Sequence, residues 1–263
     1  MFRCCRCQLK FRYPTLECYA ELYDNTSVLS WSSSAPRPAW DLIREVVSAR
    51  LPEGGRVLDF GCYTGGLLAR LGSAYERYGV EINQTAAALA AREQRATVWT
   101  STDDIPNTLR FDAILASDVI EHIPDPGRFI DMLSPLLTDD GVLIITTGDA
   151  DNRLWNRFAA NWWYCFYPEH ISFISAAWVD NYSRASGLVV KRCETFRYRK
   201  VPFARRGIET ALTYFYGYFP RLCLCVSNMA RAVLRYPQMT SVAGNGMSAD
   251  HLIVVLGRNR EYP

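Results

Sequence analysis

The sequence lacks a strong net charge, a long uninterrupted apolar run and a dense cysteine pattern. Lys and Arg exceed Asp and Glu by only two, 29 against 27, so composition gives no general case for a nucleic-acid partner. The most apolar window, residues 211–230, is interrupted by Gly217, Pro220 and Arg221, which argues against a membrane-spanning helix. The first residues carry no apolar signal segment, and nine scattered cysteines do not form a secreted disulfide scaffold. We therefore expect a cytoplasmic protein.

The composition that is present is that of a folded globular chain. Of 263 residues, 49% are hydrophobic and 21% are charged, which excludes disordered and fibrous classes. Residues 1–36 show few periodic apolar positions and end in a cluster of Ser and Pro. We expect an N-terminal lead-in over residues 1–36 and one large α/β domain over residues 37–263.

Apolar runs alternate with helical periodicity through this domain. The expected strands are residues 57–60, 78–80, 96–99, 113–116 and 142–146, followed by 188–196 and 252–256. The expected helices are residues 65–72, 84–93 and 126–137, one helix between Pro38 and Pro52, and one that Ser175 opens and Gly187 ends. Alternating strands and helices predict a doubly wound α/β fold with a mainly parallel sheet. About fifty residues, 201–250, form an insertion before the last strand.

The clearest local motif is the strand-to-helix turn at residues 57–65. Asp59 ends an apolar strand, and the small residues after it let the backbone turn tightly and a ligand approach the main chain. Glu81 ends the next strand at about the spacing of a carboxylate that binds ribose hydroxyls. A dinucleotide fingerprint requires a glycine where the chain has Tyr63. The motif therefore indicates a nucleotide-type ligand and argues against a pyrophosphate.

Four ordered segments resemble the successive motifs of class I S-adenosylmethionine-dependent methyltransferases of small molecules. The segments are residues 57–65, 79–81, 111–126 and 140–147. The resemblance is to the branch that includes ubiquinone-type O-methyltransferases and many glycan or cell-surface methyltransferases. It implies S-adenosylmethionine as the cofactor. It also implies a Rossmann-like sheet of seven strands with an antiparallel last strand and a helical insertion before it.

The resemblance also assigns cofactor-binding residues. The methionine part of the cofactor would lie among Asp59, Gly61, Cys62 and Gly65. By the same resemblance, Glu81 would bind the ribose hydroxyls and Ser117 would lie on the sulfonium side. Asp103 and Asp104 are both candidates for the adenine. Tyr63 stands where the family commonly has glycine, so it either caps the cofactor pocket or partly fills it.

Histidine supplies the candidates for acid–base chemistry. The chain has three histidines, and His122 and His170 both lie in the tripeptide Glu-His-Ile. For methyl transfer to a hydroxyl, a base helps to remove the proton, and imidazole titrates near physiological pH. We therefore predict His122 as the base and His170 as the second candidate. Packing of His122 against the cofactor explains its position equally well. Glu121 and Glu169 without further ligands are a weak metal signal, and no metal ligand is predicted.

Cys4 and Cys7 have the CxxC spacing of a zinc site. Together with the residues that follow, they resemble the second half of a zinc ribbon that precedes the domain in some of these methyltransferases. A structural zinc normally takes four ligands, and the sequence offers no second pair upstream. The motif is a remnant, a truncated zinc ribbon, or an unusual zinc site that Cys5 or Cys18 completes, and we expect a remnant or a truncation in preference to bound zinc.

The insertion combines aromatic residues with arginines. Residues 205–235 fit an interfacial helix pair on anionic lipid headgroups, and a helical lid or a homodimer contact fits them equally well. An aromatic-rich segment before the insertion suggests a wall for an apolar, aromatic or sugar substrate; its members are Trp155, Trp162, Trp163, Tyr164, Phe166 and Tyr167. The predicted function is methyl transfer to oxygen on a small molecule, a sugar or a lipid-linked acceptor. The alternative is a non-catalytic cofactor-binding scaffold descended from such enzymes.

Overall fold

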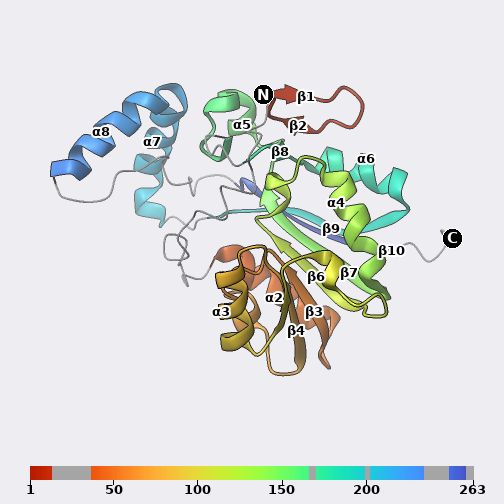
Figure 1. Cartoon of the computed structure of the whole chain (residues 1–263). Helices are drawn as coiled ribbons and strands as arrows, with labels where there is room; N and C mark the ends of the chain where they lie inside the picture. The colour runs from red at the N-terminus through yellow and green to blue at the C-terminus, as the bar shows by residue number, and fades with distance from the viewer. Residues whose placement is uncertain (14–36, 166–169, 199–201, 234–248, 259–263) are drawn as a thin grey trace.

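A seven-stranded sheet lies at the centre of the computed structural model (Figure 1). The structure describes residues 1–13, 37–165, 170–198, 202–233 and 249–258. Within these ranges the strand order is β5-β4-β3-β6-β7-β10-β9. The parallel strands are β3 (Gly55–Phe60), β4 (Tyr75–Val80), β5 (Thr97–Trp99), β6 (Phe111–Ser117) and β7 (Leu137–Gly148). The last strand, β10 (His251–Arg258), is antiparallel to β7 and to β9 (Leu188–Phe196), as predicted.

Helices cover both faces of this sheet. On one face lie α2 (Pro38–Arg50) and α3 (Gln84–Gln94), and on the other lie α4 (Pro126–Leu133) and α6 (Ala176–Ser186). Successive strand residues point to opposite faces, so Val57 packs with α2 and α3 whereas Leu58 packs with α4 and α6. Both faces are buried, and for this reason the strands are apolar runs without alternation. The predicted doubly wound α/β fold is confirmed.

Helix α6 follows its sequence signals closely. The Ser175 hydroxyl accepts a hydrogen bond from the backbone N–H of Trp178, which caps the first turn. Gly187 adopts a φ of +70° and ends the helix in the left-handed conformation that glycine favours. Both predicted ends of this helix are confirmed.

Two other predicted helices are shorter than expected. Over 65–72 the chain forms turns and one short 3₁₀ helix, because Gly65 has a φ of +81° and cannot continue a right-handed helix. The helix predicted over 126–137 ends at Leu133, since Pro135 offers no backbone N–H. The 3₁₀ helices are η1 (Leu68–Arg70), η2 (Thr102–Asp104), η3 (Ile120–His122), η4 (Ser134–Leu136), η5 (Ala159–Asn161), η6 (Trp163–Cys165) and η7 (Phe203–Arg205).

The N-terminal residues form part of a second, smaller sheet. Strands β1 (Phe2–Arg3) and β2 (Lys10–Phe11) make a hairpin, and β2 pairs antiparallel with β8 (Ser172–Phe173). Residues 1–13, which we expected to be a lead-in without regular structure, therefore form a hairpin whose second strand pairs with a strand from the middle of the domain (Figure 1). The remaining lead-in positions, 14–36, lie outside the described residues.

The insertion is helical over the part that the structure describes, as predicted. Helix α7 (Arg206–Tyr218) lies near α5 (Arg153–Phe158), and α8 (Pro220–Val233) follows it and packs on α7 at one end of the molecule (Figure 1). Tyr216 of α7 is buried against the aromatic cluster around α5, whereas no residue of α8 is buried. Within the described ranges, no helix has the length and apolar character that crossing a bilayer requires.

Candidate active site

The carboxyl ends of the central parallel strands bring most of the predicted site residues together. The backbone N–H of Gly61, after β3, donates to the carbonyl of Val80 at the end of β4. The backbone N–H of Asp118, after β6, donates to the carbonyl of Thr146 in β7. Ligands of open α/β folds bind at this edge of the sheet. Asp59, Glu81 and Ser117, predicted on three different strands, thus share one edge.

The turn after β3 requires glycine at two positions. Gly61 has a φ of +73°, and a Cβ there would lie 2.8 Å from Val119 Cγ2. Gly65 has a φ of +81°, and a Cβ there would lie 2.5 Å from Gln94 Cγ. The close approach of Val119 also shows that this turn and the segment after β6 are in contact.

Tyr63 occupies the turn with the backbone conformation of a glycine. Its φ is +46°, in the left-handed region, which costs a residue other than glycine roughly 1–2 kcal/mol. In this conformation its backbone N–H donates to Glu81 Oε2 at 2.9 Å, and the N–H of Asn83 donates to Oε1 at 2.8 Å. The two backbone groups fix the Glu81 carboxylate at the end of β4. Tyrosine at this position therefore keeps the turn geometry that glycine would give.

Two predicted residues near the turn are deeply buried. Burial raises the pKa of Asp59 to about 8, the Glu81 carboxylate adds to the effect, and Arg37 opposes it. Burial also raises the pKa of the Cys62 thiol, and its sulfur packs so closely on Gly79 that a Cβ there would lie 2.6 Å away. Cys62 thus uses its side chain for packing, and only its backbone can contribute to the turn.

The adenine candidates lie on the exposed side of the site. Asp103 and Asp104 are in η2, directly after β5, and both side chains are exposed. The backbone N–H of Asp103 donates to the Ser101 hydroxyl, which caps this short helix. Among the described residues, neither carboxylate accepts a hydrogen bond from another site residue, so both stay candidates for the adenine.

An ion pair that the sequence did not indicate lies at the carboxyl end of β6. Arg37, just before α2, lies 2.9 Å from Asp118 Oδ2. Asp118 has a φ of +55°; burial and the nearby Glu121 raise the pKa of this carboxyl, while Arg37 lowers it. Its other oxygen, Oδ1, is buried without a hydrogen-bond partner among the described residues. Ser117, beside it, accepts a hydrogen bond from the Thr146 hydroxyl at 2.9 Å.

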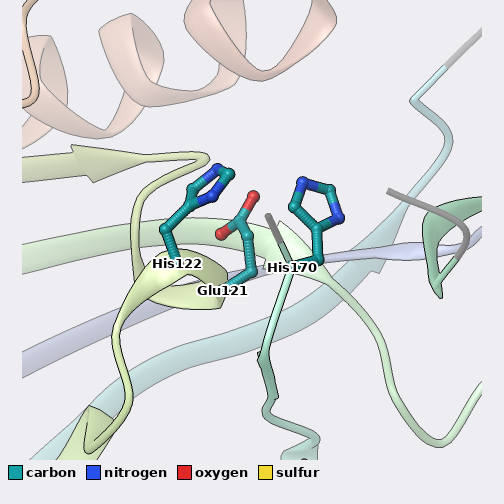
Figure 2. A group of neighbouring side chains, drawn as sticks. All are labelled: Glu121, His122 and His170. Carbon is teal, nitrogen blue, oxygen red and sulfur yellow. The ribbon is translucent and has the colours of Figure 1, made fainter. Parts of the chain in front are cut away.

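Both predicted histidines lie beside a buried glutamate (Figure 2). The rings of His122 and His170 meet edge to face, with centroids 4.8 Å apart. Glu121 is 1% exposed and accepts hydrogen bonds from the Tyr164 hydroxyl at 2.6 Å and the Thr147 hydroxyl at 2.9 Å. The sequence therefore identified the two imidazoles, but it did not identify Glu121 as the group between them or the two hydroxyls that hold it.

His170 is held in one tautomer. Its Nδ1 lies 2.8 Å from the carbonyl oxygen of Tyr164, so Nδ1 carries the proton and Nε2 carries the lone pair. Burial, and next the neighbouring His122, lower the pKa of His170 to about 3. This imidazole is therefore neutral at physiological pH.

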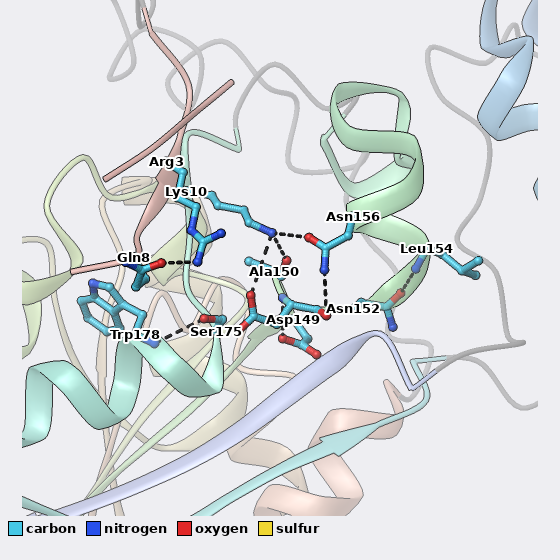
Figure 3. Close-up of polar contacts among 11 residues, drawn as sticks. Arg3, Gln8, Lys10, Asp149, Ala150, Asn152, Leu154, Asn156, Ser175 and Trp178 are labelled. Atoms are coloured by element: carbon cyan, nitrogen blue, oxygen red, sulfur yellow. Dashed lines mark hydrogen bonds and ion pairs between the residues drawn. The ribbon is translucent and has the colours of Figure 1, made fainter. Parts of the chain in front are cut away.

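The segment that carries His170 is hydrogen-bonded to the N-terminal hairpin. The backbone N–H of Arg12 donates to the carbonyl of Ile171, and the N–H of Ile171 donates to the carbonyl of Glu121, both at 2.8 Å. The Lys10 ammonium donates to the carbonyl of Ala150 and to the side chain of Asn156, so the hairpin is also tied to the start of α5 (Figure 3). The first strands of the chain thus support the histidine cluster.

The predicted aromatic wall is mostly a second core. Trp155, Trp162, Trp163 and Tyr164 are each at most 8% exposed, and they pack with Phe158, Phe173 and Tyr216. Aromatic rings usually bury their large apolar area in this way, so spacing along the sequence could not separate a wall from a core. Phe166 and Tyr167 lie outside the described residues.

Comparisons with known proteins agree with this architecture. A family model described as a methyltransferase domain matches residues 34–192. The ubiquinone biosynthesis O-methyltransferase of Bradyrhizobium diazoefficiens is 35% identical over 125 residues, which are 44% of this chain and 47% of that protein. The enzyme of the same name from Nitrobacter winogradskyi is 36% identical over 115 residues, or 40% of this chain and 42% of that protein. The matches thus span about half of these relatives.

Solved structures resemble the fold over most of the chain. The magnesium protoporphyrin IX methyltransferase of Synechocystis PCC 6803, solved with bound S-adenosylmethionine, has a TM-score of 0.54 at 14% identity. That alignment covers 94% of this chain and all (100%) of the other. The plantazolicin methyltransferase, solved with a monoazolic desmethylPZN analogue and S-adenosylhomocysteine, has a TM-score of 0.52 at 14% identity, and the alignment covers 92% of this chain and 89% of the other. At such low identity these likenesses concern the fold alone.

Proposed function

This chain belongs to the class I S-adenosylmethionine-dependent methyltransferases, and from that premise we propose that its acceptor atom is an oxygen. The acceptor would be a small molecule, a sugar or a lipid-linked compound. One observation carries the proposal: Glu121, His122 and His170 form a polar cluster. Glu121 is two positions after Val119, the residue in contact with the glycine turn. A hydroxyl must lose its proton on methylation, so a site for oxygen needs groups of this kind beside the methyl donor.

The residues at the turn fit the cofactor. When bound, S-adenosylmethionine supplies a methyl group on a sulfonium and leaves as S-adenosylhomocysteine. Gly61 leaves open the space that a Cβ would take, so a ligand can approach the main chain there. Glu81, fixed by the backbone N–H groups of Tyr63 and Asn83, would hold the ribose hydroxyls with its remaining lone pairs. The turn keeps its shape at Tyr63, which supports cofactor binding, and turnover in the assay below distinguishes the enzyme from the non-catalytic scaffold.

The acceptor proposal is tested with purified full-length chain, deuterated-methyl S-adenosylmethionine and panels of phenols, sugars and lipid-linked hydroxyl compounds. We expect calorimetric binding of S-adenosylhomocysteine and a methyl group on oxygen in at least one product, located by mass spectrometry. Amine and carbon acceptors of matched size serve as controls. Methylation confined to nitrogen or carbon would contradict the proposal while leaving the methyltransferase family intact.

We also propose that α7 and α8 contact an anionic bilayer surface at the cytoplasmic side. The two helices and the residue between them carry exposed apolar side chains: Ile208, Leu212, Phe215, Phe219, Leu222, Val226, Met229 and Val233. Residues 202–233 also hold four arginines and one acidic residue, Glu209. Apolar area flanked by cations suits the boundary between acyl chains and anionic headgroups, whereas a lid or a dimer contact does not require the cations.

Flotation with lipid vesicles tests this surface. We expect the chain to float with phosphatidylglycerol-containing vesicles and not with pure phosphatidylcholine, and to be released by salt. Replacement of Arg221 and Arg231 by glutamine should weaken binding by about tenfold or more, because each cation near the surface contributes about 1 kcal/mol. Arg92→Gln, an exposed arginine on α3, is the matched control. Salt-insensitive absence from anionic vesicles, or concentration-dependent dimerisation through Leu222 and Met229, would reject the lipid contact.

A further inference from the structure

The geometry of the histidine cluster is close to that of a metal site. Glu121, His122 and His170 each present one ligand atom, and these atoms all lie within 4.8 Å of one another (Figure 2). Three ligands on one tetrahedral ion with bonds of about 2.1 Å are about 3.4 Å apart. Side-chain rotations that move the ligand atoms by about an ångström would therefore close the cluster on an ion.

Contacts behind the cluster orient two of the three ligands. The hydrogen bond from His170 Nδ1 to the Tyr164 carbonyl leaves the lone pair on Nε2, in the ring plane and on the edge away from that carbonyl. The Tyr164 and Thr147 hydroxyls each donate to one oxygen of Glu121. Metal-binding imidazoles and carboxylates are usually held by outer hydrogen bonds of this kind, which fix tautomer and orientation before the ion arrives. Tyr164 therefore positions a nitrogen ligand and an oxygen ligand together.

Buried charge at this edge also favours a cation. Glu121 is a buried carboxylate, whereas the side chain of Asp118 is 16% exposed and pairs with Arg37. Within the described ranges, no Lys or Arg forms an ion pair with Glu121, and Asp118 Oδ1 is buried without a hydrogen bond. A buried carboxylate that receives only hydroxyl donors is costly unless a positive charge compensates it. An ion bound by Glu121 would supply that charge.

We propose that Glu121, His122 and His170 bind a divalent cation of the first transition row, with two imidazole nitrogens and one carboxylate oxygen as ligands. Mixed nitrogen and oxygen ligands favour ions such as Zn²⁺, Co²⁺ or Mn²⁺ over Mg²⁺ and Ca²⁺. Three protein ligands leave coordination positions open, as in catalytic sites.

The cation would orient the acceptor hydroxyl and lower its pKa, a role that rests on the oxygen-acceptor function proposed above. The hydroxyl proton passes to solvent, the oxygen forms the new C–O bond, and the C–S bond breaks with its electron pair left on sulfur. His122 and His170, predicted from the sequence as bases, would then act as ligands. No metal ligand was predicted from the sequence, because His122 and His170 are 48 positions apart and local spacing does not show that they meet.

Cobalt titration of the tag-free, metal-depleted full chain tests the site. We expect one tightly bound Co²⁺ per chain, seen as a visible d–d absorption band typical of nitrogen and oxygen ligands. Glu121→Gln and His170→Gln should each weaken binding by at least about tenfold. A variant with Cys4→Ser and Cys7→Ser is the control for the other candidate ligands, and it should bind as the wild type does. Circular dichroism checks that each variant is folded.

The wild-type titration decides the question even if a variant fails to fold. Three results would each overturn the proposal. The first is weak cobalt binding that Glu121→Gln leaves unchanged, and the second is the absence of a d–d band. The third is a sulfur-to-cobalt charge-transfer band that disappears when Cys4 and Cys7 are replaced. Calorimetry with S-adenosylhomocysteine on the same samples separates it from the proposed function. Cofactor binding without the cobalt site overturns only the metal inference, whereas a cobalt site in a chain that methylates no oxygen overturns only the acceptor function.

Discussion

Replacing His122 with alanine is expected to lower turnover by about 100-fold or more, with the affinity for S-adenosylhomocysteine kept within about threefold. The imidazole lies edge to face against His170 and next to Glu121, on the side where the acceptor would lose its proton. Contact with the cofactor turn comes instead through Val119. The loss is expected whether the ring takes a proton or holds a cation, because both roles act on the acceptor.

The measurement pairs steady-state kinetics with calorimetry on the same preparation. Met132→Ala, an exposed apolar residue on α4, is a suitable control for changes on the surface. A parallel loss of turnover and cofactor affinity in His122→Ala would move this residue into the cofactor site. Unchanged turnover would remove the histidine cluster from the chemistry.

Replacing Glu81 with alanine is expected to raise the Kd for S-adenosylhomocysteine by about 100-fold. Hydrogen bonds to a charged group contribute about 1.5–3 kcal/mol each, so losing two from the ribose hydroxyls is enough for this effect. The variant also frees the backbone N–H groups of Tyr63 and Asn83, which the carboxylate holds. Because Tyr63 lies in the left-handed region, the turn then loses the contact that offsets its strain.

A second glutamate on the same strand provides the control. Glu76 is largely exposed on β4, and Glu76→Ala should bind S-adenosylhomocysteine as the wild type does. Urea denaturation of both variants separates loss of folding from loss of binding. If folded Glu81→Ala binds the cofactor product with unchanged affinity, the assignment of Glu81 to the ribose is wrong.

The features that the sequence predicted are those with local signals. Strand runs, the cap at Ser175 and the glycines of the turn each involve residues a few positions apart, so spacing alone identifies them. The helix expected over 65–72 was wrong because Gly65 takes a positive φ, which a helical apolar pattern does not reveal. The same pattern gives the wrong end for α4, where Pro135 stops the helix.

Contacts between distant segments account for what the sequence missed. Arg37 pairs with Asp118 across 81 positions, and Tyr164 donates to Glu121 across 43. Nothing in either local segment indicates its partner, since only the closing of the sheet brings them together. The hydroxyl donors to Glu121 come from β7 and from η6, and the fold brings Glu121, His122 and His170 into one cluster.

The pairing of β2 with β8 has a consequence for modularity. The family model begins at residue 34, yet the backbone contacts that seat Ile171 beside Glu121 start from Arg12. The cofactor turn receives none of these contacts among the described residues. A chimera that exchanges residues 1–13 for those of a relative should therefore change the acceptor preference more than the cofactor affinity. The hairpin would then influence substrate specificity independently of cofactor binding.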